Sequence, residues 1–131
     1  MSIIVGYVPT AEGTAALDRA ITEAHKSQSR LVIINSSRGD AIVDKRYAQA
    51  ADINEVTERL EQEGIDHLVL QPVRGNDAAN EVLEAAEKYR AELIVIGLRR
   101  RTPVGKLIMG STAQQILLEA ACPVLAVKAS A

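Results

Sequence analysis

Five short runs of aliphatic, mostly β-branched residues recur along the chain, and segments with helical spacing separate them. The runs are residues 3–8, 31–36, 67–72, 92–97 and 123–128, which read IIVGYV, LVIINS, HLVLQP, ELIVIG and PVLAVK. None of them alternates cleanly between apolar and polar residues, which is typical of strands buried on both faces of a sheet. Strands of this kind need a helical layer on each side, so this feature limits the choice of fold more than any other.

The segments between the runs carry apolar residues at the spacing of one helix face. We expect four helices, with stripes formed by Ala15, Ala16, Ala20, Ile21 and Ala24, by Ile53, Val56 and Leu60, by Val82, Ala85, Ala86 and Tyr89, and by Ile116, Leu117 and Ala120. Each connection between parallel strands is a right-handed crossover of about a dozen residues. The alternation therefore predicts the α/β class, with an open, doubly wound, five-stranded parallel sheet and helices on both faces.

Individual residues mark where these helices begin and end. Asp77 precedes the third helix and Ser111 or Thr112 precedes the fourth, and each offers a side-chain oxygen as a cap. Gly64 is placed to end the second helix. Residues 37–46, SRGDAIVDKR, show no helical pattern and are expected to form a loop, in which Arg-Gly-Asp is a plain turn.

Composition narrows the possible partners and the compartment. A chain of 131 residues, 47% of them hydrophobic, is the size of one domain, so we expect a single domain over 1–131. The formal charge of −2 and an aromatic fraction of 2% disfavour nucleic acid as a partner. Cys122 is the only cysteine and no apolar run is long enough for a signal or a membrane span, so we expect a cytoplasmic protein that does not bind membranes.

Ligands of open α/β sheets bind beyond the carboxyl ends of the strands. The candidate residues at those ends are Tyr7, Val8 and Pro9, then Ser36, and then Ile96 and Gly97. The segment 97–112, GLRRRTPVGKLIMGST, adds cationic side chains, a glycine that lets a phosphate approach, and a helix start whose N–H groups favour an anion. Its candidates are Arg99, Arg100, Lys106, Gly110, Ser111 and Thr112. The segment is either a phosphate-binding loop or a solvated basic surface loop.

Two common nucleotide motifs do not fit the spacing. A P-loop has the pattern Gly, four residues, Gly-Lys-Ser/Thr. With Gly105 and Lys106 as its Gly-Lys pair, it needs Gly at 100 and Ser or Thr at 107, but the chain has Arg100 and Leu107. The turn after the first run, GYVPTAEG, lacks the closely spaced glycines of a dinucleotide-binding fingerprint.

The segment resembles the motif of the universal stress protein family, which is Gly, two residues, Gly, nine residues, and Gly-Ser/Thr after the fourth strand. Gly97, Gly110 and Ser111 fall on that pattern, and AELIVIG and ACPVLAVK extend the resemblance over nearly the whole chain. The resemblance implies strand order 3-2-1-4-5 and an adenine nucleotide between the ends of the first and fourth strands. The nucleotide would be ATP or AMP, with Mg²⁺ accompanying ATP. The resemblance also implies a homodimer through the strand Pro123–Val127.

Two positions depart from the family pattern. Arg100 stands where the family has its second loop glycine, and Val8 stands where an aspartate usually ends the first strand. Both changes remove features that face the nucleotide, because glycine allows close backbone approach and the carboxylate can pair with a ribose hydroxyl. The leading hypothesis is therefore a stress-response regulatory protein that binds an adenine nucleotide. The alternative is a dimeric interaction protein of the same fold that has lost nucleotide binding.

An enzyme is the third reading and the least supported. No carboxylate lies in the loop to orient water for a slow ATPase or a kinase-like reaction, and no pair of nucleophile and base stands out. We expect neither catalytic residues nor a protein-built metal site. The pattern does not name the stress or the downstream protein partner.

Overall fold

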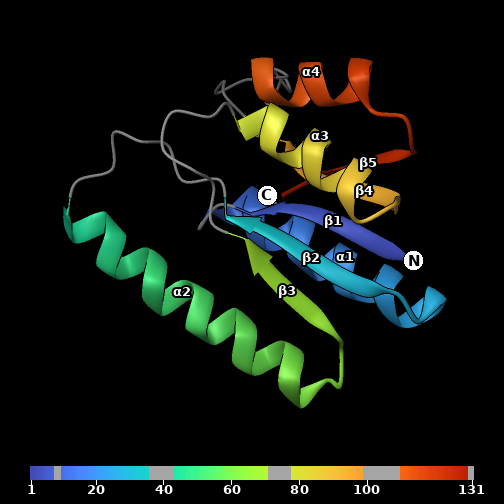
Figure 1. The fold of residues 1–131 in the computed structure, drawn as a ribbon. Helices are drawn as coiled ribbons and strands as arrows, with labels where there is room; N and C mark the ends of the chain where they lie inside the picture. Colours follow the sequence, from blue (N-terminus) through green and yellow to red (C-terminus); the bar gives the residue numbers. More distant parts are fainter. Residues whose placement is uncertain (8–9, 36–42, 71–77, 99–109, 130–131) are drawn as a thin grey trace.

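The computed structural model describes residues 1–7, 10–35, 43–70, 78–98 and 110–129, with the backbone alone for 43–52. Strands and helices alternate along the chain (Figure 1). They are β1 (Ser2–Tyr7), α1 (Ala11–Ser27), β2 (Arg30–Asn35), α2 (Val43–Gln62), β3 (His67–Leu70), α3 (Ala78–Lys88), β4 (Ala91–Leu98), α4 (Ser111–Glu119) and β5 (Val124–Lys128).

The strands form one parallel sheet in the order β3-β2-β1-β4-β5. The predicted fold class and strand order are both confirmed. β1 runs beside β2 from the pair Ser2 and Arg30 to the pair Tyr7 and Asn35, and beside β4 on its other edge. The chain moves outward through β2 and β3, then returns to the far side of β1 for β4 and β5. Because strand order reverses between β1 and β4, their carboxyl ends form the switch point where ligands of open sheets bind.

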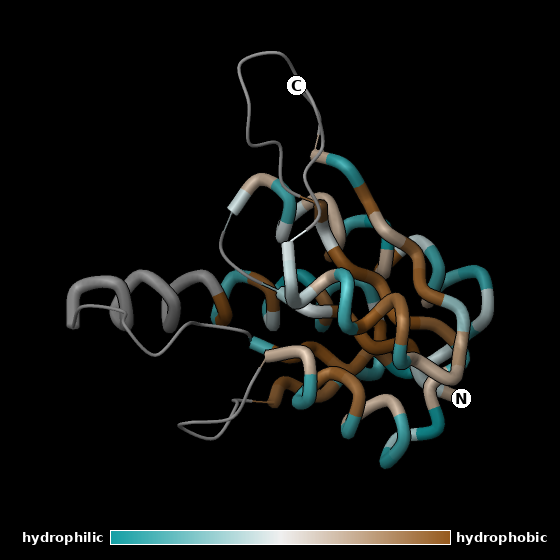
Figure 2. Tube along the Cα trace, turned by 90° about the horizontal axis from the view of Figure 1, so that it is seen from above, coloured by the Kyte–Doolittle hydropathy of each residue, from teal (hydrophilic) through white to brown (hydrophobic). Residues whose placement is uncertain are grey.

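Each face of the sheet packs against two helices. Alternate residues of β1 point to opposite faces, so Ile3 and Val5 join the core under α1 and α2 while Ile4 joins the core under α3 and α4. Figure 2 shows the hydrophobic (brown) stretches gathered in the strands at the centre of the molecule. The largest fully buried side chains are all Ile, Leu or Val, namely Ile3, Ile4, Leu31, Ile33, Ile34, Leu60, Ile94, Ile116, Val5, Val32, Val82 and Val95.

The helices differ from the expected pattern at two points. α2 begins at Val43, so residues 43–46 are helical and not part of a loop; the residues at 43–46 tolerate a helix even though they offer no apolar stripe. Leu117 was expected on the buried stripe of α4 but is 36% exposed, because the buried position of that helix is Ile116. The end of α2 at Gly64 is confirmed: its φ of +71° is the left-handed conformation that glycine adopts without strain.

Asp77 lies outside the described residues, so its expected role as a cap stays a prediction. Within the described ranges, no helix is both long and apolar enough to cross a membrane.

Candidate functional site

The N-terminus of α4 lies at the carboxyl edge of the sheet and has no side-chain cap. Gly110 is the N-cap residue, with extended backbone (φ −70°, ψ 162°), and its carbonyl accepts the first helical hydrogen bond from the Gln114 N–H at 3.0 Å. The prediction that Ser111 or Thr112 is the cap is wrong, because both residues already belong to the first turn of the helix. A glycine cap has no side-chain oxygen, so the N–H groups of that turn receive no hydrogen bond from a cap side chain.

The N-terminus of α1 also lies at this edge, and it is capped in the usual way. At α1, the Thr10 hydroxyl oxygen accepts a hydrogen bond from the Gly13 N–H at 3.2 Å. Both helices therefore present their N-termini to this edge, but the two N-termini differ in their caps. α1 satisfies one of its donors with the Thr10 side chain, whereas the cap residue of α4 supplies no side-chain acceptor. Such a helix start, with the positive end of its dipole, is suited to an anion.

Neither packing nor backbone conformation requires a glycine at position 110. Its φ is one that any residue adopts, and an added Cβ would meet no described atom within 4 Å. Gly110 and Ser111 are exposed and Thr112 is half-buried. Among the described residues, no atom therefore lies against the position of a side chain at 110, and the exposed Ser111 follows it at the start of α4.

Gly97 of β4 has a packing role of its own. The first turn of α1 lies directly over its backbone, so an added Cβ would overlap the Glu12 carbonyl oxygen and come within 2.7 Å of the Glu12 carbonyl carbon. Real Cβ atoms do not approach backbone this closely. The close seating of α1 on β4 therefore accounts for this glycine without a ligand, and contact between Gly97 and a ligand stays a prediction.

The predicted residues on the strands are interior residues. Tyr7 is 6% exposed and packs in the core under α1 and α2, and Ile96 is 5% exposed and packs in the core under α3 and α4. The structure thus brings Tyr7, Gly97 and the start of α4 to one edge of the sheet. The remaining predicted residues lie outside the described part of the chain, namely Val8, Pro9, Ser36, Arg99, Arg100 and Lys106.

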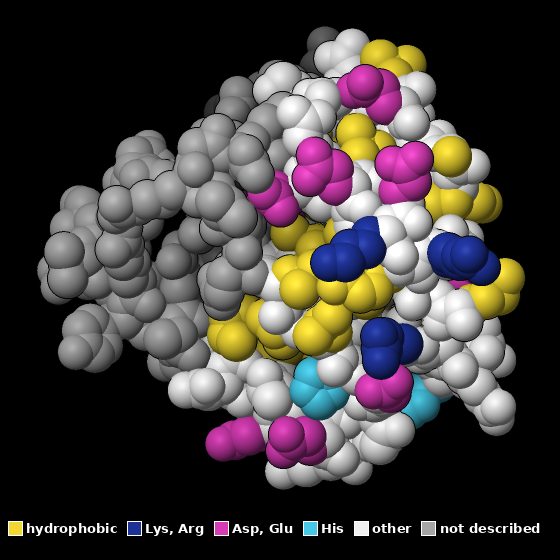
Figure 3. Space-filling model, in the orientation of Figure 1, with side chains coloured by type: hydrophobic (Ala, Val, Ile, Leu, Met, Phe, Trp, Pro, Cys, Tyr) yellow, Lys and Arg dark blue, Asp and Glu magenta, His cyan; other side chains and the backbone are white. Residues whose placement is uncertain are grey.

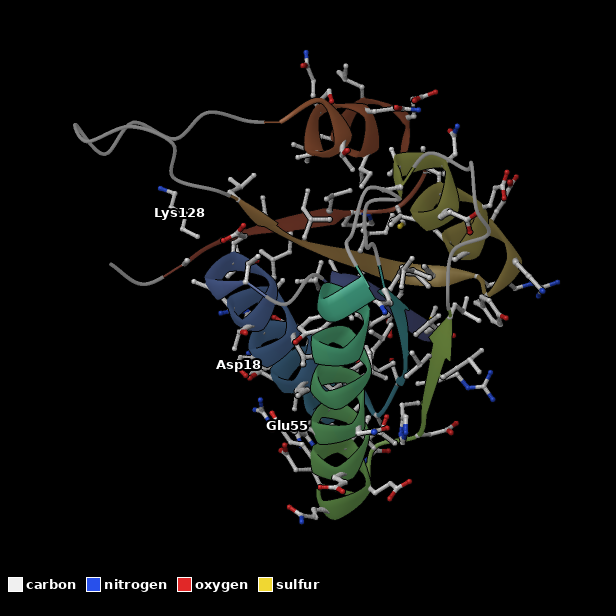
Figure 4. All side chains as sticks on the ribbon, turned by 90° about the vertical axis from the view of Figure 1, so that its left-hand side faces the viewer. Asp18, Glu55 and Lys128 are labelled. Carbon is white, nitrogen blue, oxygen red and sulfur yellow. The ribbon has the colours of Figure 1, made fainter. Side chains whose placement is uncertain are left out.

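Two polar residues at this edge were not among the predicted site residues. Asn35 ends β2 beside Tyr7 and is 3% exposed, which is unusual for an amide side chain. Lys128 ends β5 beside Leu98, the last residue before the basic segment, and is exposed. Figure 4 shows its labelled side chain extending to the side of the sheet opposite α1. The only sequence signal for either residue was a polar side chain at the end of an apolar run.

Cys122 does not behave as a reactive thiol. It packs at the border of the core under α3 and α4, and this burial raises the pKa of its thiol above the ordinary value. A raised pKa leaves less thiolate at neutral pH, so the group is a poor nucleophile. Among the residues that the structure describes, no three His, Cys, Asp or Glu side chains come together as metal ligands would.

The fold and this edge define the class of the protein: a doubly wound α/β domain with an uncapped helix at its switch point. Residues 1–128 match the model of the universal stress protein family, and the chain belongs to that family. A universal stress protein of Mycolicibacterium smegmatis is 46% identical to it over 126 residues, which is 96% of each chain. Among solved structures, a universal stress protein from Archaeoglobus fulgidus is 27% identical with a TM-score of 0.76, covering 98% of both chains.

Several solved proteins of this fold contain adenine nucleotides. A universal stress protein from Archaeoglobus fulgidus in complex with dAMP is 19% identical, with a TM-score of 0.67 and 98% of both chains covered. A second universal stress protein, in complex with cAMP, is 23% identical, with a TM-score of 0.69. A family protein from Arabidopsis thaliana with AMP bound is 14% identical, also with a TM-score of 0.69. At these identities the likeness shows a shared fold.

Proposed function

We propose that this protein binds an adenine nucleotide at the carboxyl edge of its sheet and acts as a stress-response regulator in the cytoplasm. The observation that carries the proposal is the N-terminus of α4, which is headed by the exposed Gly110, has no side-chain cap and lies at the switch point of the sheet. An anion such as a phosphate would receive the hydrogen bonds that a cap otherwise supplies. Family members with AMP, dAMP and cAMP support the choice of an adenine nucleotide.

The chain's own residues suggest how the ligand would be held. The first turn of α4 and the Ser111 hydroxyl would donate to phosphate oxygens, and the arginines at 99–101 would add charge. If the nucleotide is ATP, Mg²⁺ would accompany the phosphates. The described residues at this edge include no pair of nucleophile and base, and the role that we propose is binding and signalling.

Calorimetry of the purified protein with ATP, AMP and cAMP tests the proposal, together with mass spectrometry for any nucleotide retained through purification. A dissociation constant below about 100 μM, equivalent to roughly 5.5 kcal/mol, would distinguish a built pocket from general attraction to arginine. Weaker binding of all three nucleotides, with none retained, would refute the proposal.

The second candidate function is a dimeric interaction protein that has lost the nucleotide. Val8 and Arg100, the two departures from the family pattern, favour it. The double variant Val8→Asp and Arg100→Gly restores the pattern and distinguishes the candidates. A gain in ATP affinity would show that these two residues weaken a pocket that is otherwise intact. If the parent and the double variant both fail to bind, the second candidate is favoured.

Both candidates include a homodimer through β5. β5 is one of the two edge strands, and among the described strands it pairs with β4 alone, so one row of its backbone N–H and C=O groups faces outward. Val124 to Val127 are each only half-buried. An antiparallel pairing of two β5 strands about a twofold axis would satisfy this edge and cover the apolar side chains.

A further inference from the structure

α4 carries two large apolar side chains that the core of its own domain leaves partly open to solvent. Ile116 is 2% exposed, whereas the next two residues, Leu117 and Leu118, are 36% and 76% exposed. Figure 3 shows hydrophobic side chains (yellow) exposed at the top of the view, where Figure 1 places α4. The two leucines point in different directions, so the position of α4 in the fold decides which of them can face a partner.

The contact between α4 and α3 fixes the direction in which Leu117 points. The Gln115 Nε2 atom of α4 donates to the Asn80 Oδ1 atom of α3 at 3.2 Å, so the Gln115 side of α4 faces α3. Successive helix residues are about 100° apart, which places Leu117 nearly opposite Gln115 and Leu118 within about 60° of Gln115. Because α4 connects β4 to the edge strand β5, the Leu117 flank faces the outer side of β5.

A dimer through β5 would bring the two copies of α4 together. A twofold axis that pairs two β5 strands antiparallel stands perpendicular to the sheet, so both copies of α4 lie on the same face of the joined sheet. Ile116 belongs to the core that Ile94 of β4 and Val124 of β5 also line, so α4 covers both strands. A helix over the middle of this strand pair lies about 5 Å from the axis, and two such helices are roughly 10 Å apart, as helices in direct contact are.

Leu117 also lies at the level of the axis. Pairing β5 along its full length centres the axis on Ala126, the middle residue of the strand. From the first residue of β5 to Ala126 the strand rises about 7 Å, which equals four to five residues of helix. Four residues before Ala120, the C-cap of α4, is Ile116, which points into the core, and the next residue is Leu117. Leu117 of one copy therefore meets Leu117 of the partner subunit.

Lys128 offers a charge that matches the end of the partner's α4. Val124 and Ala126 pack in the core under α3 and α4, so Lys128 lies on that face too, and Figure 4 shows its labelled side chain on the side of the sheet opposite α1. In the antiparallel pair, Lys128 lies beside Val124 of the partner subunit, near the end of the partner's α4. The last turn of α4 contains no basic residue, so the negative end of its dipole receives no cation from its own turn.

We propose that the two α4 helices pack against each other across the twofold axis of a β5 dimer. Leu117 of each copy lies at their contact, and Lys128 of each copy lies at the C-terminal end of the partner's α4. The proposal rests on the dimer proposed above and is independent of the nucleotide. β5 has five residues and is about 17 Å long, so its edge covers only part of the roughly 800 Å² that each partner buries in a stable interface. The helix contact supplies surface that the strand lacks.

The dissociation constant of the dimer, measured by analytical ultracentrifugation without nucleotide, tests the helix contact. Leu117→Ala should weaken the dimer at least about tenfold, because each dimer loses two apolar contacts. Leu118→Ala is the matched control and should change the constant by less than about threefold, although Leu118 is the more exposed of the two. Lys128→Met should weaken the dimer about threefold or more, because two helix ends lose a cation, whereas Lys128→Arg should keep the parent affinity.

Cross-linking gives a second readout that does not depend on affinity. Two helices roughly 10 Å apart bring facing Cβ atoms to about 4 Å, a separation that suits a disulfide. Under mild oxidation, Leu117→Cys should form a covalent dimer. Leu118→Cys should not, and neither should the parent, whose native cysteine is the half-buried Cys122.

The results separate this proposal from the dimer itself. A parent that is monomeric at about 100 μM would contradict both. A dimeric parent whose affinity is unchanged in Leu117→Ala, or in which Leu117→Cys forms no covalent dimer, would refute the helix contact and leave pairing through β5 in place. Equal weakening by Leu118→Ala and Leu117→Ala would refute the helix contact as well. An unchanged affinity in Lys128→Met would refute the part assigned to Lys128.

Discussion

Gly97 and Gly110 lie on one sequence motif but have different physical roles. At Gly97 the backbone of Glu12 occupies the space of a side chain, whereas at Gly110 that space is open and the backbone is ordinary. The first glycine lets α1 sit on β4, and the second leaves the start of α4 accessible. The motif alone could not separate these roles, because both positions read simply as glycine.

The two alanine substitutions should differ in stability. Gly97→Ala forces a Cβ into the Glu12 backbone and should cost about 1–3 kcal/mol of unfolding free energy, as overpacked sites do. Gly110→Ala meets no described atom, so its cost should stay within about 1 kcal/mol, the loss of a favourable cap residue. Urea denaturation measures both. Equal costs at the two positions would contradict the packing role of Gly97.

At the scale of elements, the strands could be predicted because each strand is a continuous apolar run, whereas their order followed from the resemblance to the universal stress protein family. The ends of the helices were harder to predict from the sequence. The start of α4 was misplaced by one residue because Ser111 is a common cap, and the sequence does not show that the preceding glycine already takes that position. Leu117 was misassigned because α4 has Ile116, Leu117 and Leu118 in a row, and periodicity cannot decide which of them faces the sheet.

Asn35 and Lys128 were missed because their place at the edge follows from strand register.

The basic segment after β4 allows a prediction from its charge. If the arginines at 99–101 contact an anionic ligand, replacing all three with alanine should weaken nucleotide binding, and it should also reduce the dependence of affinity on salt. Calorimetry at two salt concentrations measures both effects. Unchanged affinity and an unchanged salt slope would place these side chains in solvent.

At the scale of the whole molecule, β5 is the strand through which we propose that two copies assemble. The strand closes one side of the sheet and ends at Lys128, beside the last described residue of β4. A dimer through this edge would place two candidate sites in one particle, each one strand away from the interface.

Leu125→Pro tests the edge. Proline removes a backbone donor from the middle of β5 and should give a monomer or an aggregate, while the parent is a dimer at about 100 μM, as a contact worth roughly 8 kcal/mol would ensure. Light scattering measures the mass of each. A parent that is monomeric at that concentration would contradict assembly through β5.

The most direct test of the central claim is calorimetry of nucleotide binding to Gly110→Val beside the parent, with Leu118→Ala as a control. Leu118 lies on the same helix and is 76% exposed, so its loss should leave binding and folding intact. We predict that the parent binds AMP or ATP with a dissociation constant below about 100 μM. Gly110→Val should weaken that binding at least about tenfold, roughly 1.4 kcal/mol, because its side chain covers the N–H groups of α4 while the fold survives. A Gly110→Val variant that binds as tightly as the parent would contradict the claim that the start of α4 receives the phosphate.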